Sequence, residues 1–149
     1  MESLETLSAF SNWIAPNLEK EKSELKHAAH DFLGNEYAAI KIKNSLASAP
    51  VTELSESDWE SLENTDSFHN VRFGSIHDAR SITEEYNGLL DTDSKRDFEA
   101  LLNSFMENNA MECPTIVKKD GKMHLISGNT RLMIARALGI KPKVIIAEV

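Results

Sequence analysis

A segment with the sequence Ser-Gly-Asn-Thr-Arg lies between a short apolar stretch, Met123 to Ile126, and a helical pattern that ends at Gly139. Glycine permits a sharp turn, and the first backbone N–H groups of a helix lack partners within it and carry the positive end of its dipole. Hydroxyl, amide and guanidinium groups at such a turn are donors suited to a phosphate. The pattern therefore predicts a phosphate-binding loop formed by Ser127, Gly128, Asn129, Thr130 and Arg131.

The surroundings of this loop resemble the ParB/sulfiredoxin-like superfamily, whose members carry a strand, a Gly-x-x-Arg box and a helix in this order. The box corresponds to Gly128 to Arg131, and residues 98–117 are similar to the family's preceding helix and strand. Residues 143–147 resemble its closing strand, and the region from Val71 to Arg80 is expected to hold its first strand and a following arginine. The resemblance implies a small mixed sheet with flanking helices.

The same resemblance implies a nucleotide or nucleic-acid phosphate as ligand, with Mg²⁺ accompanying a nucleotide. Small phage- or plasmid-type accessory proteins are the members that this short chain is most similar to. The box lacks the acidic residue and the second arginine of nucleotide-cleaving members. Asn129 occupies the position of the catalytic cysteine of sulfiredoxins, so sulfiredoxin activity is excluded.

Three residues outside the loop are candidates for the wall of a pocket: His124, Arg80 and Glu112. His124 alternates with its strand neighbours and can assist proton transfer or bind phosphate if its face lines the site; otherwise it is a half-exposed strand histidine. Glu84 and Glu85 are further carboxylates that could hold Mg²⁺. No residue is assigned as catalytic, and no protein metal site is predicted.

Three functions stay open at this point. The first is a nucleotide- or phosphate-binding module with an accessory or regulatory role. The second is an enzyme, either a phosphotransferase or a nucleotide hydrolase or nuclease. The third is a non-catalytic interaction protein, in which Asn129 or Thr130 only caps a helix and Arg131 faces solvent.

Charge and composition limit the ligands and the cellular compartment that we expect for this protein. The net charge of −8 argues against strong non-specific DNA binding, which depends on neutralising many phosphates, although basic residues outnumber acidic ones after residue 110. No apolar run approaches the roughly 20 residues that span a bilayer, and Cys113 has no second cysteine to pair with. We expect a cytoplasmic protein that does not enter a membrane.

The element pattern predicts an α+β protein with a helical N-terminal extension at 1–65 and a ParB/sulfiredoxin-like core at 66–149. Within the extension we expect a helix from Ser3 to Ile14 and helices from Asn17 to Leu46 that divide at Gly34. The acidic helices could cover the pocket, bind a partner protein or form a homodimer. Their charged face includes Glu19, Lys20, Glu21, Lys22, Glu24 and Lys26, and we expect it to face solvent.

Shorter elements complete the expectation. Ser55 to Glu63 reads as a short helix with a serine cap, and Phe68 to Ile76 as an irregular strand. For the stretch from Asp78 to Gly88, the sequence predicts no regular element beyond a single helical turn. A helix from Lys95 to Asn108 is expected to begin at Asp93 or Ser94 as its cap.

Overall fold

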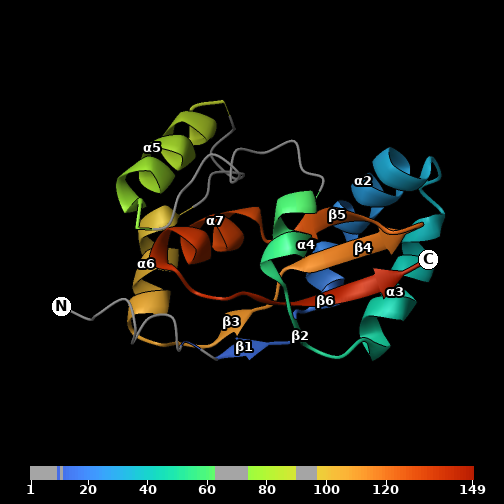
Figure 1. Cartoon of the computed structure of the whole chain (residues 1–149). Helices are drawn as coiled ribbons and strands as arrows, with labels where there is room; N and C mark the ends of the chain where they lie inside the picture. Colours follow the sequence, from blue (N-terminus) through green and yellow to red (C-terminus); the bar gives the residue numbers. More distant parts are fainter. Residues whose placement is uncertain (1–9, 11, 63–73, 90–96) are drawn as a thin grey trace. The chain divides into compact units, whose positions relative to one another are not determined.

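The structure is a computed structural model that describes residues 10, 12–62, 74–89 and 97–149 (Figure 1). It confirms the α+β class. The chain forms two compact units, each assembled from segments that alternate along the sequence. The sheet unit comprises residues 13–65, 112–128 and 142–149, and the helical unit comprises residues 1–12, 66–111 and 129–141.

This interleaving differs from the consecutive division at residue 65 that we expected. Residues 13–65 do not form a separate extension, because they supply an edge strand and two helices to the same unit as the central strands. Hydrogen bonding in a sheet joins segments by their position in space and not by their order in the chain. A domain boundary predicted from the order of elements along the chain can therefore separate segments that belong to one folded unit.

A four-stranded sheet forms the framework of the sheet unit. Its strand order is β2-β6-β4-β5, with β4 parallel to β6 and both outer pairs antiparallel. The strands expected near the candidate loop are confirmed. Their bounds are Thr115–Lys119 for β4, Lys122–Ser127 for β5 and Lys143–Glu148 for β6. The edge strand β2 (Thr52–Glu53) was not predicted.

Helices α2 (Lys22–Leu33) and α3 (Ala38–Ser48) cover one face of this sheet. Helix α2 packs against β5 and α3 packs against β6, which closes an apolar core. The expected division of the helical region is confirmed, since Gly34 ends α2 with a φ of 70° that side chains disfavour. The buried members of the core are Leu25, Ala28, Ala29, Ile42, Leu46, Val117, Ile126, Ile145 and Ala147.

The short helix α4 (Glu56–Ser61) packs against β5, and in Figure 1 it crosses in front of the sheet. The Ser55 hydroxyl accepts a hydrogen bond from the backbone N–H of Asp58 at 3.0 Å, which confirms the predicted cap.

The expectation of a helix from Ser3 to Ile14 is wrong at its end. Trp13–Ile14 forms strand β1, which pairs with β3 (Met111–Glu112) in a separate two-stranded sheet. The backbone N–H of Cys113 donates to the Ile14 carbonyl at 2.8 Å, so a partner distant in sequence decides the conformation here. Residues 3–9 and 11 lie outside the described residues.

The helical unit contains α5 (Ile76–Asn87), α6 (Phe98–Met106) and α7 (Asn129–Leu138). Ile76, the last residue of the irregular strand expected from Phe68 to Ile76, is instead the first residue of α5, and the helical turn expected within 78–88 is a full helix. The cap of α6 is Asp97, whose carboxylate accepts from Ala100 N–H at 3.0 Å, and not Asp93 or Ser94. Residues 63–73 and 90–96 lie outside the description.

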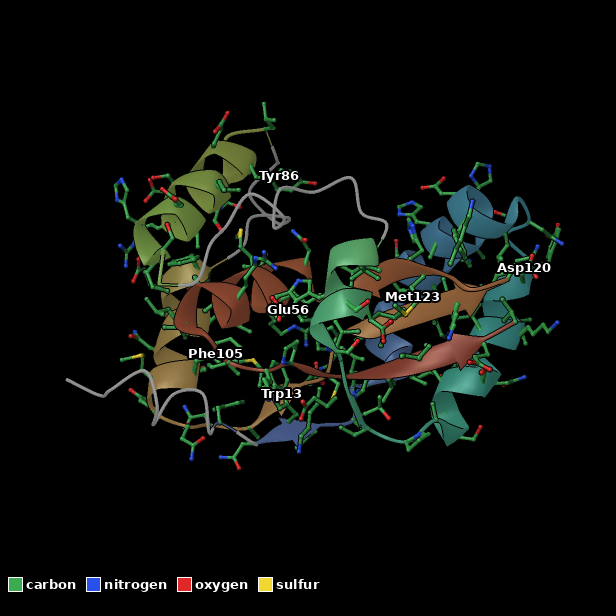
Figure 2. All side chains as sticks on the ribbon, viewed as in Figure 1. Trp13, Glu56, Tyr86, Phe105, Asp120 and Met123 are labelled. Atoms are coloured by element: carbon green, nitrogen blue, oxygen red, sulfur yellow. The ribbon has the colours of Figure 1, made fainter. Side chains whose placement is uncertain are left out.

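Aromatic packing and one ion pair hold the helical unit together. The rings of Phe10 and Phe105 meet edge to face with centroids 5.2 Å apart, and Phe105, labelled in Figure 2, is only 1% exposed. Arg80 of α5 donates from Nε to a Glu99 carboxylate oxygen at 2.5 Å, and its guanidinium lies 5.4 Å from the Phe98 ring centroid. These contacts connect α5 to α6.

Candidate phosphate-binding segment

The candidate segment begins at the end of a β-hairpin. Strands β4 and β5 are joined by Asp120 and Gly121, whose φ values of 52° and 80° are those of a tight hairpin turn. Their register shifts by one residue near the other end of the hairpin. Ile116 lies opposite Leu125, whereas Thr115 lies opposite Ser127, which leaves Ile126 as the extra residue of a β-bulge.

The bulge brings the hydroxyls of Thr115 and Ser127 together. Directly opposite residues of an antiparallel pair project from the same face of the sheet, and here the two hydroxyl oxygens lie 2.9 Å apart. Without the shift, Ser127 would not oppose Thr115. The last residue of β5 is thus placed over a buried threonine that is fully inaccessible to solvent.

A buried carboxylate completes this arrangement. The Ser127 hydroxyl donates to Glu21 Oε1 at 2.8 Å, and the Thr115 hydroxyl donates to Glu21 Oε2 at 3.3 Å. Glu21 is 8% exposed, so the expectation that its charged neighbourhood faces solvent is wrong for this residue. Burying a carboxylate is costly unless it accepts hydrogen bonds, and the two hydroxyls supply them. We call Glu21, Thr115 and Ser127 the Glu–Thr–Ser cluster.

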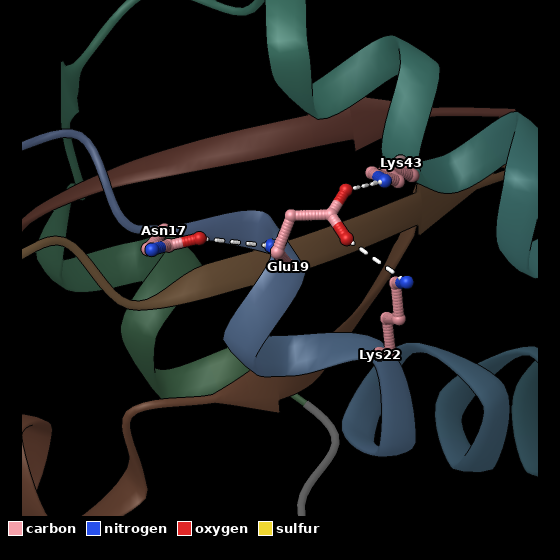
Figure 3. Close-up of polar contacts among 4 residues, drawn as sticks. All are labelled: Asn17, Glu19, Lys22 and Lys43. Atoms are coloured by element: carbon pink, nitrogen blue, oxygen red, sulfur yellow. Dashed lines mark hydrogen bonds and ion pairs between the residues drawn. The ribbon is translucent and has the colours of Figure 1, made fainter.

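Glu21 is the last residue of a 3₁₀ turn, η1 (Leu18–Glu21), which precedes α2. The predicted cap is confirmed, because Asn17 Oδ1 accepts from the backbone N–H of Glu19 at 3.0 Å (Figure 3). Lys22 lies 2.9 Å from Glu19 Oε2, and Lys43 of α3 contacts Glu19 Oε1 (Figure 3). These contacts fix the turn that carries Glu21.

The two lysines act on the titration of Glu19. Hydrogen bonds from Lys43 and then from Lys22, together with their positive charges, lower the pKa of Glu19 from 4.5 to about 2. A carboxyl with a depressed pKa in the folded state stabilises that state fully above its unfolded pKa. Its contribution is therefore complete above pH 4.5 and is lost as the pH falls towards about 2.

We expect Lys43→Met to raise the pKa of Glu19 towards its ordinary value of 4.5, since its main hydrogen-bond donor is removed. An NMR titration of the Glu19 carboxyl carbon measures this directly. Lys41→Met is the matched control, because Lys41 lies on the same helix but makes no described contact with Glu19. An unchanged Glu19 pKa in Lys43→Met would contradict the contact.

Gly128 carries the chain from β5 into α7 with a φ of 99°. A Cβ at this position would lie 2.7 Å from Pro114 Cβ and 2.8 Å from Pro114 Cα. Both the backbone angle and the close approach of Pro114 therefore require glycine. The sharp turn expected at Gly128 is present.

Helix α7 begins immediately after this glycine, at Asn129. Thr130 and Arg131 follow in its first turn, as the sequence predicted. Thr130 is 5% exposed, and its hydroxyl has no hydrogen-bond partner among the residues that the structure describes. A buried hydroxyl without a hydrogen-bond partner lowers the stability of the folded state. The burial of the Thr130 hydroxyl is therefore not explained by the described contacts.

The three pocket candidates occupy separate surroundings. The His124 ring stacks on Phe32 of α2, with centroids 5.2 Å apart and an interplanar angle of 18°. Arg80 is engaged by Glu99, and Glu112 Oε1 accepts from the backbone N–H of Asn17 at 3.3 Å. Each thus has a described neighbour of its own, and no described contact joins the three.

Within the described ranges, no group of three or more His, Cys, Asp or Glu side chains is placed to hold a metal ion. His30 Nδ1 lies 3.0 Å from Asp31 Oδ1, and this hydrogen bond is the main cause that lowers the Asp31 pKa. Both residues are exposed on α2.

The sequence alone identified the segment but not the Glu–Thr–Ser cluster. Glu21 stands in a run of charged residues that gives no sign of burial, and its distance from Ser127 in sequence hides the contact. One feature of the sequence could have indicated the bulge. In the stretch Met123 to Ile126, apolar and polar residues alternate until Leu125 and Ile126, which are both apolar, and such a break in alternation is typical of a bulge.

Comparison with protein-family models, with characterised proteins and with solved structures gave no match for this chain. The described helices include none that is long and apolar enough to cross a membrane. The function is therefore argued from the segment and the cluster beside it.

Proposed function

We propose that this chain binds the phosphate of a nucleotide or nucleic acid through Ser127–Arg131 and serves as an accessory or regulatory protein. The observation that carries the proposal is the buried Thr130 hydroxyl in the first turn of α7, which has no partner among the described residues. An oxygen of a bound phosphate would accept its hydrogen bond. The backbone N–H groups in the first turn of a helix, which have no acceptor within the helix itself, favour the same anion.

The residues of the segment then have distinct roles. Gly128 allows the backbone to turn, and Asn129 and Thr130 donate hydrogen bonds. Arg131 neutralises charge in a geometry that can engage two phosphate oxygens. Ser127 has a different role from the direct donor that the sequence suggested, because its hydroxyl donates to Glu21.

The order of elements agrees with the resemblance to ParB/sulfiredoxin-like proteins, since β5, Gly128, α7 and β6 follow one another as expected. We extend the proposal to a nucleotide bound with Mg²⁺ as the ligand and to the cytoplasm as its setting. The fully buried thiol of Cys113, which has no cysteine to pair with in the chain, agrees with a reducing compartment.

Calorimetric titration of CTP, ATP, ADP and a short DNA duplex, each with Mg²⁺, tests the proposal. We expect one of these ligands to bind, and Arg131→Ala to weaken binding by about 1.5–3 kcal/mol through loss of a charge-assisted hydrogen bond. Arg136→Ala is the matched control, because Arg136 lies in the last turn of the same helix. It should change affinity little.

Equal weakening by both arginine variants would point to general electrostatic attraction and contradict a specific segment. A folded wild-type protein that binds none of the four ligands would contradict the proposal outright. The non-catalytic interaction protein would then be favoured, with the exposed Tyr37 and Ile40 at the start of α3 as the first surface to test.

A phosphotransferase or nucleotide hydrolase is the second candidate function. The observation in its favour is Glu21, because its carboxylate contacts Ser127 and supplies the acidic group that the Gly-x-x-Arg box lacks. Release of inorganic phosphate or of nucleoside diphosphate from the ligand that binds, abolished in Glu21→Gln, would support turnover.

A further inference from the structure

We infer that the outer face of α3 is a self-association surface, on which a second copy of this chain docks through a two-fold axis. Tyr37 is 79% exposed and Ile40 is 69% exposed, and both lie at the start of the helix. Glu36 and Lys41, which flank them in the chain, are exposed as well. We call these four residues the α3 stripe. The inference does not rest on the proposed function, because no residue of the stripe belongs to Ser127–Arg131.

The helix itself holds the stripe away from the apolar core. Ile42 and Leu46 are the buried residues of α3 and belong to that core. Tyr37 has helical φ and ψ values of −68° and −19°, and the backbone N–H of Ala39 donates to the Glu36 carbonyl at 3.1 Å. The helical path therefore includes the whole stripe. Successive helical residues are about 100° apart, so the stripe is centred nearly opposite the buried pair.

The order of side chains in the stripe is self-complementary. Along the helix, a negative charge is followed by two apolar side chains and then by a positive charge. A two-fold axis that passes between Tyr37 and Ile40 reverses this order in the second copy. Glu36 of each copy then lies opposite Lys41 of the other, while the apolar side chains meet at the centre. An apolar centre with polar groups at its rim is the usual composition of a protein interface.

The charges favour a second copy over another partner. Neither Glu36 nor Lys41 has an ion-pair partner among the residues that the structure describes. An acidic partner surface would repel Glu36, and a basic one would repel Lys41. A partner that satisfies both must carry the reverse order of charges over about 7.5 Å of helix, and a copy related by a two-fold axis has it by symmetry. The neutral stripe also limits the repulsion between two chains that each carry a net charge of −8.

The size of the stripe determines how strong this association is. Four side chains per copy bury less than the roughly 1,200–2,000 Å² of a standard stable interface. We therefore expect a weak dimer that exchanges with the monomer between micromolar and millimolar concentrations. Analytical ultracentrifugation of the full chain over this range measures the dissociation constant.

Reversal of one charge tests the reciprocal ion pairs. Glu36→Lys gives each copy two positive charges in the stripe, and Lys41→Glu gives each copy two negative charges. Both ion pairs then become repulsive, and we expect each variant to raise the dissociation constant of the dimer about tenfold or more. Glu24→Lys and Lys26→Glu are the matched controls, because they change the net charge by the same amounts at exposed positions of α2. They should change the dissociation constant little.

A mixture of Glu36→Lys and Lys41→Glu tests the two-fold arrangement itself. In a mixed dimer, the two positive charges of one variant lie opposite the two negative charges of the other, so both ion pairs are restored. We expect the mixture to associate with about wild-type affinity at concentrations where each variant alone stays monomeric. Docking of the stripe onto a different face of the second copy does not give this recovery.

Ile40→Ser tests the apolar centre of the dimer. The side chain is mostly exposed, so we expect an unchanged circular dichroism spectrum and a dimer weakened at least severalfold. Wild-type protein that stays monomeric over the whole range would overturn the inference. So would a folded Glu36→Lys, Lys41→Glu or Ile40→Ser that dimerises as the wild type does, or a mixture that associates no better than its components. Each of these results leaves phosphate binding to be decided by its own titration.

Discussion

Gly128→Ala should lower the free energy of unfolding by about 2–5 kcal/mol, because a left-handed backbone angle and an overpacked contact add together. The φ of 99° disfavours any side chain. The new methyl group would also lie 2.7 Å from Pro114 Cβ, a distance that real side-chain atoms do not adopt. Pro114 has a rigid ring, so the backbone of the turn must move.

Urea unfolding followed by tryptophan fluorescence measures this loss. Trp13 and Trp59 are the two tryptophans of the chain, and both belong to the sheet unit, as does Gly128. Gly34→Ala separates the two causes, because Gly34 has a φ of 70° but no atom within 4 Å of an added Cβ. It should cost about 1–2 kcal/mol, from the backbone angle alone. Equal losses in the two variants would show that the Pro114 contact is not rigid.

Phe105→Ala should cost about 3–5 kcal/mol, through lost burial and the cavity that remains. Phe105 is 1% exposed, and its ring meets that of Phe10 edge to face. The substitution removes both the apolar burial and this aromatic contact from the helical unit.

Far-UV circular dichroism during urea unfolding follows the helices, while tryptophan fluorescence follows the sheet unit. We expect the circular dichroism midpoint to fall strongly in Phe105→Ala. Leu89→Ala is the control, since Leu89 is 83% exposed and its truncation should change stability by no more than about 0.5 kcal/mol. A loss below about 1 kcal/mol in Phe105→Ala would contradict its place as a core residue.

The sequence predicted those elements whose ends carry local signals. Asn17 and Ser55 cap their helices with side-chain oxygens, and Gly34 ends α2 in the left-handed region. Such signals depend on a few neighbouring residues and can be read directly. Helix α5 was missed because its buried face includes Thr83, whose hydroxyl donates to the Ala79 carbonyl and so hides a polar residue in an apolar stripe.

Elements decided by distant partners could not be predicted in this way. Trp13 and Ile14 have the spacing of an amphipathic helix, yet they pair with Met111 and Glu112. The same limit applies to the candidate site. The turn from β5 into α7 was predicted, whereas Glu21 was not, because its burial arises only when η1 folds onto the end of the hairpin. Phosphate binding by the segment stays a prediction.

The position of β6 has a consequence for how the protein acquires its structure during synthesis. This strand lies between β2 and β4 in the sheet, although it is translated after both. Residue 52 must wait for residue 144 before it gains its backbone partner, and the parallel pair of β4 and β6 also forms late. Sheets dominated by such non-local pairs fold slowly. The nascent chain therefore emerges from the ribosome with the place between β2 and β4 empty, so the largely buried strand β4 has an edge without its parallel partner until β6 has been synthesised.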